Sequence, residues 1–468
     1  MPEGRIIGLV GLGVMGRNLA LNLADHGIRV AAYDLDEAAL AGLADAPGIA
    51  LAASPPALVR QLKPPRAVLI MVNAGAATDR ALAALGPELE PGDIVVDGGN
   101  ANYLDSMRHA EELAARQLRF VGLGVSGGAE GARHGPALMA GGDAGAYCEL
   151  EPLLAAVAAR AGGRACLGYF GATGAGHFVK MAHNAIEYAV MAAIAEAWLM
   201  LRRVVGLDHD AARREILAWN QGESRSYLLE ITLDVLSRRD ADTGSPLVEV
   251  ILDRAEQKGT GAWAVEAALA LGVPIPSLAE AVFARTLSSL KDERVMAEQR
   301  LGAPLGAMPE HVSALLRQLP QALRATTIAC YAQGFALIQA GSAQHGWHID
   351  PAEVAAVWQG GCILRAALLE RIAAGYRLEP GLANLMLDPA IAGAMAAGEA
   401  DWRAAVAAAT LGGVPAPVMA SALHHYLGYR TASGSAALIQ AQRDRFGGHG
   451  FQRIDRGGIY HGPWGRSS

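Results

Sequence analysis

The chain has 468 residues, of which 52% are hydrophobic and 18% are charged, and its formal net charge is −7. This composition excludes an intrinsically disordered protein, because an aliphatic chain with little charge buries enough surface to offset the entropy of ordering. The four cysteines are scattered without a C-x-x-C pair, which excludes a disulfide scaffold and argues against a structural zinc site. The acidic balance argues against a general nucleic-acid-binding protein.

Neither a signal peptide nor a membrane span is expected. The first residues lead directly into the apolar run Ile6–Val10, without the basic segment that opens a signal peptide. The longest apolar stretch, Tyr188–Leu201, contains Glu196 and is shorter than the roughly 20 residues that a membrane span needs. We therefore expect a soluble, cytoplasmic protein that does not act on membranes.

The first predicted domain covers residues 1–176, where short β-rich runs alternate with helical patterns. This order predicts a doubly wound, mostly parallel α/β sheet of Rossmann type. The expected strands are Ile6–Val10, Arg29–Tyr33, Ala67–Val72, Ile94–Asp97 and Arg119–Gly122, and the expected helices are Gly16–Gly27, Asp36–Leu43, Ala77–Leu85 and Asp105–Arg116.

A G-x-G-x-x-G motif joins the first expected strand to the first expected helix. Its glycines permit a tight turn, close approach of the backbone to a pyrophosphate, and close packing of helix on sheet. The N–H groups at the start of the helix then face the phosphates. We expect a dinucleotide here, and the alternative is a glycine-rich turn without a ligand. The expected contacts come from Gly11, Leu12, Gly13, Val14, Met15 and Gly16.

An acidic residue ends the second expected strand. Asp34 lies eighteen residues after Gly16, near the spacing of the acid that binds a ribose 2′-hydroxyl. Its carboxylate would accept hydrogen bonds from the diol of NAD and repel the 2′-phosphate of NADP. Leu35 and Asp36 supply no cation for that phosphate, so NAD is the expected cofactor and NADP is disfavoured. A helix N-cap is the alternative role for an acid here, and Asp36 suits it.

Two more glycine-rich segments, Asp97–Asn100 and Val125–Gly131, follow expected strands. They therefore belong to the carboxyl edge of the sheet, where ligands bind in such folds. Taken singly, each is better explained as a turn with a solvated charge.

The second predicted domain, residues 177–434, is Ala-rich and helix-periodic, which predicts a large all-α domain. A polar stripe opens it on an otherwise apolar helix: Lys180, His183, Asn184, Glu187 and Tyr188 are spaced so that they share one face. A structural Lys–Glu ion pair is one interpretation. The other is an acid/base pair in a cleft, since burial lowers the pKa of a lysine and raises that of a glutamate.

Two cationic positions in this domain suit a phosphate. Lys258 stands in the loop Gln257–Gly261 beside Thr260, among backbone donors. Arg285 lies in an apolar helix, where an arginine needs an anionic partner. A turn with a solvated charge is the alternative for the loop.

Residues 435–468 form a C-terminal tail rich in Gly, Arg and His, with little apolar periodicity. Such a segment cannot form its own apolar core. It is either disordered or laid onto another surface, such as a partner subunit. Arg443 and His449 lie in it.

These motifs together closely resemble the long-chain decarboxylating 6-phosphogluconate dehydrogenases, over nearly the whole chain. The segments that carry the resemblance are Gly11–Gly16 with Arg17-Asn18-Leu19, Asp97–Asn100, Val125–Gly128, Gly176–Met181, His183-Asn184, Glu187-Tyr188, Gln257–Gly261, Phe283–Arg285, Leu287–Lys291 and Gln440–Asp444.

The resemblance implies oxidation of 6-phosphogluconate at C3, loss of CO2 and formation of ribulose 5-phosphate, without a metal, as in the pentose phosphate pathway. It implies that Lys180 is the general base for the C3 hydroxyl and that Glu187 is the acid that helps to protonate C1 of the enediol. It also implies a homodimer in which tail residues reach the other subunit's site. The residues implied to hold the sugar acid and its phosphate are Asn100, Ser126, Gly127, Gly128, His183, Asn184, Tyr188, Lys258, Thr260, Arg285, Arg443 and His449.

The sequence departs from the usual family pattern beside the cofactor. The common form after the second strand is Asn-Arg-Ser/Thr, with the arginine on the 2′-phosphate, whereas this chain has Asp34-Leu35-Asp36. The family often has a lysine where Asn73 stands in the cofactor segment Val72-Asn73-Ala74. Both departures agree with a preference for NAD.

Two other functions are compatible with parts of the sequence. An NAD-dependent β-hydroxyacid dehydrogenase acting on another sugar acid is the first alternative, although Lys258, Arg285 and Arg443 would have little to bind in an unphosphorylated acid. A non-catalytic dinucleotide sensor is the second, and the presence of both Lys180 and Glu187 argues against it.

Overall fold

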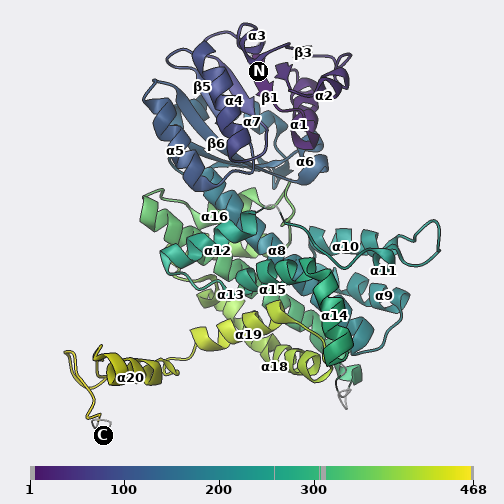
Figure 1. Cartoon of the computed structure of the whole chain (residues 1–468), viewed down its shortest axis with the longest axis vertical. Helices are drawn as coiled ribbons and strands as arrows, with labels where there is room; N and C mark the ends of the chain where they lie inside the picture. Colours follow the sequence, from purple (N-terminus) through teal and green to yellow (C-terminus); the bar gives the residue numbers. More distant parts are fainter. Residues whose placement is uncertain (1–5, 258, 305, 307–311, 465–468) are drawn as a thin grey trace. The chain divides into compact units, whose positions relative to one another are not determined.

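The computed structural model describes residues 6–257, 259–304, 306 and 312–464. The chain divides into two compact units, Met1–Ala422 and Leu423–Ser468. The first unit opens with a sheet and its helices and continues as a helical array (Figure 1).

The sheet consists of β1 (Ile6–Val10), β2 (Arg29–Tyr33), β3 (Ile49–Leu51), β4 (Ala67–Ile70), β5 (Ile94–Asp97), β6 (Arg119–Ser126), β7 (Ala137–Gly142) and β10 (Leu167–Tyr169). Their spatial order is β10-β7-β6-β5-β4-β1-β2-β3. All neighbouring pairs are parallel except β6 and β7. The expected doubly wound, mostly parallel sheet is therefore confirmed.

Helices cover both faces of this sheet, because successive side chains of a strand point to opposite faces. Leu69 of β4 joins a core with residues of α1 and α7, whereas Val68 and Ile70 join a second core with residues of α3, α4 and α5. These helices, with α2 and α6, are α1 (Val14–Asp25), α2 (Glu37–Ala41), α3 (Pro55–Val59), α4 (Ala76–Leu85), α5 (Tyr103–Ala114), α6 (Gly128–His134) and α7 (Ala144–Val157).

All five expected strands exist, although β4 ends two residues earlier than expected and β6 continues four residues further. Three more strands of this sheet, β3, β7 and β10, are not expected from the sequence, nor are the two short strands β8 (Arg160–Ala161) and β9 (Arg164–Ala165), which pair with each other. β3 and β10 have only three residues each, and β7 reads Ala-Leu-Met-Ala-Gly-Gly, without the β-branched residues that mark a strand. Small residues suit β7 because α8 packs directly on it.

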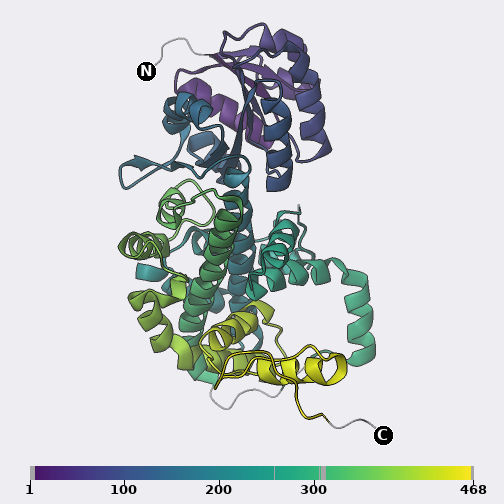
Figure 2. The ribbon, with the colours of Figure 1, turned by 90° about the vertical axis from the view of Figure 1, so that its left-hand side faces the viewer.

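The helical part of the first unit is built around α8 (Ala175–Arg203), which contacts β6 and β7 at its start and then runs beside α15 (Val312–His345), as seen in Figures 1 and 2. A Cβ on Gly341 or Gly334 of α15 would come within 2.4 Å of Phe178 or Ile186 of α8, so these glycines permit the close approach. The remaining helices are α9 (His209–Trp219), α10 (Tyr227–Ser237), α11 (Leu247–Val250), α12 (Thr260–Leu271), α13 (Pro276–Ser289), α14 (Lys291–Leu301), α16 (Pro351–Val357), α17 (Leu368–Leu378), α18 (Pro389–Leu411) and α19 (Pro417–Tyr429).

Among the described residues, α8 is long and apolar enough to cross a membrane by length and composition alone. However, 67% of its apolar window is buried inside the protein. Its start also carries the buried polar side chains of the stripe. These features are those of a core helix.

The second unit contains α20 (Ala436–Gly447) and the segment that follows it. This segment folds back so that Phe451 and Tyr460 form a bridge. The buried Asp444 carboxylate organises it, accepting hydrogen bonds from the backbone N–H groups of Gly450 and Gly462 and from Trp464 Nε1. Hydrogen bonds to one acid therefore supply the order that the sequence could not assign to an apolar core.

Candidate active site

The polar stripe predicted from the sequence lies on the first half of α8, where the helix meets the sheet. Lys180, His183, Asn184 and Tyr188 are buried, and the Glu187 side chain is 20% exposed. Ionisable and amide side chains at this depth need partners, because each loses its hydration on burial.

Lys180 packs against the sheet at Gly124 of β6. A Cβ on Gly124 would lie 2.5 Å from Lys180 Cβ, so only glycine lets the lysine side chain pass here. Burial lowers the pKa of Lys180 below the ordinary value, and the neighbouring Glu187 carboxylate opposes that shift. A lysine held this way releases its proton more readily than one in water, which suits a base.

Glu187 shows the opposite shift for the same reason. Burial raises the pKa of its carboxyl group, and the charges of Lys180 and Arg285 oppose the change. One acid and one base whose pKa values move toward each other can exchange roles in proton transfer near neutral pH.

A chain of hydrogen bonds connects α8 to the edge of the sheet. Ser126 Oγ at the end of β6 lies 3.3 Å from His183 Nε2, and His183 Nδ1 lies 3.2 Å from Asn184 Oδ1. Asn184 Nδ2 donates to Asn100 Oδ1 at 3.2 Å, and Glu187 Oε2 is 3.7 Å from His183 Nδ1. Burial lowers the pKa of His183 well below its ordinary value, so its ring is neutral. The structure thus brings these five predicted residues together.

Glycines shape the turn after Ser126. Gly127 has φ +113° and Gly128 has φ +62°, conformations that other residues rarely adopt. A Cβ on Gly127 would lie 2.5 Å from the carbonyl oxygen of Gly361. The turn therefore exposes backbone N–H groups at the start of α6 next to the stripe.

Arg285 lies at the far end of the stripe, beside Tyr188. The Arg285 guanidinium, on α13, stacks 3.5 Å above the ring of Tyr188, and burial lowers the pKa of Arg285. Thr260 is buried at the start of α12, next to Gly261, whose Cβ position lies 3.1 Å from the Tyr188 ring. Lys258, predicted to act with them, lies outside the described residues.

The glycine motif forms a cradle at the end of β1. Gly11 has φ +99°, and a Cβ on Gly16 would lie 1.9 Å from the Gly11 carbonyl oxygen, so both positions require glycine. Nothing lies within 4 Å of the Cβ position of Gly13, and no side chain caps the start of α1. These unfilled features fit the pyrophosphate of a dinucleotide.

Asp34 lies beside this cradle. Its Oδ2 accepts a hydrogen bond from Leu12 N, and its Oδ1 accepts one from Asp36 N at 2.9 Å. Leu35 is 86% exposed, and Asp36 caps α2 by accepting from Ala38 N. The carboxylate of Asp34 is thus held in one place at the cofactor edge of β2.

The segment after β4 also reaches this edge of the sheet. Val72, Asn73 and Ala74 lead into Gly75, which has φ +77° and begins α4 without a side-chain cap. Thr78 Oγ1 donates to the Asn73 carbonyl at 3.2 Å, which holds the turn.

Arg443 and His449 belong to the second unit, whereas the residues above belong to the first. Arg443 Nη1 donates to Gln440 Oε1 at 3.0 Å on α20, and His449 follows the end of that helix. Both side chains are exposed.

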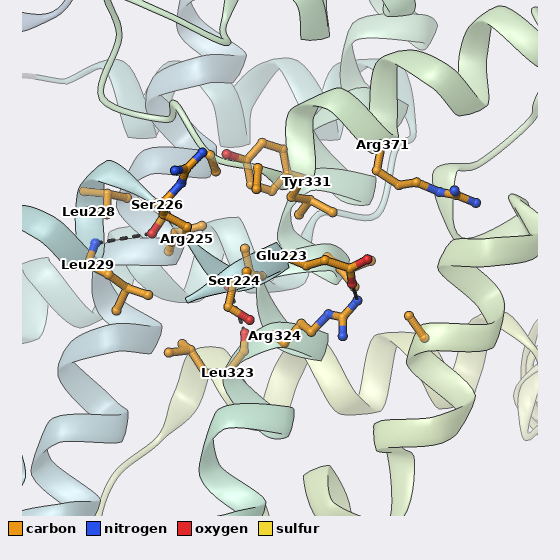
Figure 3. Close-up of a pocket in the computed structure, with 18 of the residues that line it drawn as sticks. Glu223, Ser224, Arg225, Ser226, Leu228, Leu229, Leu323, Arg324, Tyr331 and Arg371 are labelled. Carbon is orange, nitrogen blue, oxygen red and sulfur yellow. Dashed lines mark hydrogen bonds and ion pairs between the residues drawn. The ribbon is translucent and has the colours of Figure 1, made fainter. Parts of the chain in front are cut away.

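A cavity of about 800 Å³ lies further along α8, lined by Val190 and Ile194 of that helix. Figure 3 shows Glu223 and Arg324 paired in it. None of its lining residues is a predicted site residue. Among the residues that the structure describes, no cluster of three or more His, Cys, Asp or Glu side chains could hold a metal ion.

Two buried residues next to the site are not among the site residues predicted from the sequence. Ser106 of α5 and His177 of α8 form a hydrogen bond of 2.6 Å. The only available signal was that His177 precedes Lys180 by three residues and so shares its face of the helix.

Comparison with protein families gives a match on both parts of the chain. Residues 6–171 match the NAD binding domain of 6-phosphogluconate dehydrogenase, and residues 176–464 match the 6-phosphogluconate dehydrogenase C-terminal domain.

Individual relatives match over nearly their whole length. The chain is 44% identical over 462 residues to the NADP(+)-dependent decarboxylating 6-phosphogluconate dehydrogenase of Bacillus subtilis, covering 98% of both chains. It is 44% identical to the decarboxylating 6-phosphogluconate dehydrogenase 1 of Saccharomyces cerevisiae, over 95% of this chain and 92% of the other.

Among solved structures, the chain resembles the 6-phosphogluconate dehydrogenase of Plasmodium falciparum, with a TM-score of 0.92 and 34% identity. The match covers 98% of this chain and 100% of the other. That enzyme was solved in its apo form, with its cofactor NADP+ and with its substrate 6-phosphogluconate.

Proposed function

The chain belongs to the family of decarboxylating 6-phosphogluconate dehydrogenases, and from this premise we propose that it oxidises 6-phosphogluconate at C3 with NAD, releases CO2 and forms ribulose 5-phosphate. The observation that carries the proposal is the buried pair Lys180 and Glu187 on α8, with opposite pKa shifts, inside a set of polar side chains that suits a sugar acid.

The glycine cradle Gly11–Gly16 and Asp34 would hold the dinucleotide, and Val72, Asn73, Ala74 and Asn100 would line its nicotinamide half. When bound, the nicotinamide accepts the hydride that leaves C3 of the substrate. The protein residues supply binding, orientation and proton transfer.

Lys180 acts first. Its neutral Nζ takes the proton of the C3 hydroxyl while the C3–H bond breaks, which leaves a ketone at C3 and a β-keto acid. The protonated Nζ then donates a hydrogen bond to that ketone oxygen and stabilises the negative charge that develops there. The bond between C2 and the carboxylate carbon then breaks and CO2 leaves. The electron pair of that bond forms a double bond between C2 and C3, and the C3 oxygen takes the proton from Nζ, which gives an enediol.

Glu187 acts last. The protonated carboxyl group helps to deliver a proton to the enediol carbon that lost the carboxylate, which becomes C1 of the product. The neutral Lys180 Nζ takes the proton of the neighbouring hydroxyl, which restores the ketone. The raised pKa of Glu187 supports this role, because it keeps the group protonated nearer to neutral pH.

The remaining polar residues hold the substrate in this proposal. The side chains of Asn100, Ser126, His183 and Asn184, with the backbone of Gly127 and Gly128, bind the sugar acid near its carboxylate and hydroxyl groups. At the other end of the stripe, the phosphate is bound by Tyr188, Thr260, Arg285 and Lys258.

NAD is the proposed cofactor although a relative is named NADP-dependent. The Asp34 carboxylate is held by two backbone N–H groups where a ribose diol would lie, and Leu35 replaces the arginine that usually binds a 2′-phosphate. A fixed negative charge there opposes a second negative charge on the ligand.

Steady-state kinetics with 6-phosphogluconate test the reaction and the cofactor. We expect CO2 release coupled to NADH formation and a kcat/KM that is higher with NAD than with NADP. A higher value with NADP would refute the cofactor preference, and a failure to release CO2 with either cofactor would refute the reaction.

Replacing Lys180 by Met tests the base. We expect kcat to fall about 10²- to 10⁴-fold, the usual contribution of a positioned base. Binding of NADH, measured by fluorescence titration, should be unchanged. Retained turnover would remove Lys180 from the mechanism.

We further propose a homodimer in which the tail of each subunit completes the site of the other with Arg443 and His449. Leu438, Ile439 and Phe446 on α20 are more than half exposed within their unit, and exposed apolar side chains on a polar tail suit burial against another chain.

A further inference from the structure

A buried hydrogen bond ties α8 to α5 one turn before Lys180. Ser106 Oγ of α5 and His177 Nδ1 of α8 lie 2.6 Å apart, and both side chains are at most 1% exposed. Since α5 begins directly after the Asn100 segment, this bond joins the helix of the base to the loop on the cofactor side of the site.

The protonation of this pair follows from its surroundings. Burial lowers the pKa of His177, so the ring is neutral and carries one proton. Its Nε2 is buried without a well-formed hydrogen bond, next to the backbone of Asp97 and Gly99, which opposes the pKa shift. Nδ1 and Ser106 Oγ share a hydrogen bond, and Ser106 Oγ also lies 3.2 Å from the Asn102 carbonyl oxygen. The pair therefore connects α8 to the residues that follow Asn100.

The loop that carries Asn100, between β5 and α5, is held by hydrogen bonds at both of its ends. Asp97 Oδ1 accepts from Gly99 N at 2.9 Å where β5 stops, and Asn102 Oδ1 accepts from Leu104 N at 3.0 Å where α5 starts. Asn100 lies between these two hydrogen bonds, and its Oδ1 accepts a hydrogen bond from Asn184 Nδ2 of α8.

The packing of α8 on the sheet leaves little freedom in the same place. A Cβ on Gly122 would lie 3.0 Å from His177 Nδ1, and a Cβ on Gly124 would lie 2.5 Å from Lys180 Cβ. The His177 ring and the Lys180 side chain therefore rest directly on the backbone of β6, and the loop that bears Asn100 is the part whose position the hydrogen bonds decide.

We propose that His177 is a positioning residue: with Ser106 it holds the Asn100 loop in register with Lys180, so that the C3 hydrogen and the C3 hydroxyl are presented to the cofactor and to the base together. This rests on the proposed function, which places the substrate between Asn100 and Lys180. Displacements of about 1 Å at such a site can cost about 100-fold in rate.

The test uses the full-length enzyme and three variants. Ser106→Ala removes the hydroxyl, His177→Phe keeps a ring without its nitrogens, and His177→Asn restores a hydrogen-bonding group near the place of Nδ1. His109→Phe is the matched control, because His109 is another buried imidazole, on α5, and it bonds to Asp79 instead. Measurements are kcat, KM, the melting temperature, and the deuterium isotope effect on kcat with substrate labelled at C3.

We expect Ser106→Ala and His177→Phe to lower kcat about 10- to 100-fold and to raise the isotope effect, because misaligned hydride transfer becomes rate-limiting. KM for 6-phosphogluconate should change less than kcat. His177→Asn should recover most of kcat, and His109→Phe should lower only the melting temperature.

Unchanged kcat and isotope effect in folded Ser106→Ala would overturn the inference, as would a loss of melting temperature alone. If His177→Phe does not fold, Ser106→Ala decides by itself. Wild-type enzyme in the same assay separates the two ideas: its inability to turn over 6-phosphogluconate would refute the proposed function, whereas an active wild type with unaffected variants refutes only the role of His177.

Discussion

Lys180 and Glu187 influence each other's proton affinity across two turns of α8. Burial pulls their pKa values toward each other, and their mutual attraction pushes them apart. Each therefore sets the pH range in which the other works. If the same two residues formed an ion pair on the surface, both would be charged at neutral pH, and neither would be ready to take or give a proton.

Replacing Glu187 by Gln tests this coupling. The Glu187 charge raises the pKa of Lys180, so its removal should lower that pKa further. The base then stays neutral to lower pH, and the acid limb of the kcat/KM profile should move to lower pH. In addition, kcat should fall about 10²- to 10⁴-fold through loss of the acid. Glu266→Gln changes an exposed residue of α12 and is the control. It should leave the acid limb of the kcat/KM profile at its wild-type pH. A limb that moves to higher pH would contradict the coupling.

The Asp34 charge predicts a specificity change. In the double variant Asp34→Asn with Leu35→Arg, a repelling carboxylate is replaced by a cation near the 2′-phosphate position. We expect the NADP/NAD ratio of kcat/KM to rise by roughly 100-fold, as removal of a like-charge contact worth several kcal/mol allows. Glu37→Gln removes a neighbouring charge on α2 and serves as the control. Equal ratios in all three proteins would show that Asp34 does not select the cofactor.

At the scale of elements, α8 acts as the frame on which the site is built. It carries the stripe, packs on β6 and β7 through glycines, and is bonded to the loops after β5 and β6 by Asn184 and His183. A long buried helix suits this role, because its side chains hold fixed spacings along one face.

The segment that follows α20 is held largely by one carboxylate, that of Asp444. Asp444 accepts from the N–H groups of Gly450, Gly462 and Trp464 and also pairs with His461 at 2.7 Å. These bonds, Gly462 N first, lower the pKa of Asp444 far below its ordinary value. A depressed pKa means that the contribution of Asp444 to the stability of this segment is fully present above the unfolded pKa of about 4 and is lost progressively as the pH falls from there through the folded pKa.

Asp444→Asn should therefore loosen the segment at neutral pH, because an amide accepts at one oxygen only and presents a donor to other donors. We expect hydrogen exchange of residues 450–464 to accelerate at least about 10-fold while residues of α8 keep their protection. Asp455→Asn, which removes the exposed pair with Arg453, is the matched control. Unchanged exchange in Asp444→Asn would mean that other contacts order the tail.

At the scale of the whole molecule, the tail is a separate compact unit from the one that holds Lys180. If the sites of a dimer are completed by exchange, two different inactive subunits should complement each other. Lys180→Met inactivates the site of its own subunit. Arg443→Ala inactivates the site of the partner subunit, which would lose the arginine of the exchanged tail.

A purified mixed dimer of Lys180→Met and Arg443→Ala subunits should recover about half of the wild-type activity, because one of its two sites then has an intact Lys180 and an intact partner tail. Both parental homodimers should be nearly inactive. No recovery in the mixed dimer would show that Arg443 acts within its own chain. An active Arg443→Ala homodimer would show that Arg443 does not act at the site.

Five of the six strands that the structure describes before residue 127 were predictable, because buried parallel strands contain runs of apolar residues between helical periods, whereas β3, with three residues, was not predicted. The five strands found this way are present. β7 was not predicted because it consists of small residues. These residues make room for α8, and that contact joins segments far apart in the sequence. The tail is ordered by Asp444 through residues up to twenty positions away, which no local period reveals.

The same division applies to the site. By itself, the sequence determined the glycine cradle, the acid after β2 and the spacing of Lys180, Glu187 and their neighbours on one helix face, because backbone conformation and helical period are local properties. Only the tertiary structure decided that Asn100, Ser126 and Arg285 meet this face, that burial shifts the two pKa values in opposite directions, and that His177 bonds to Ser106. Those facts depend on which surfaces exclude water and on contacts across the fold, and neither is encoded in spacing alone.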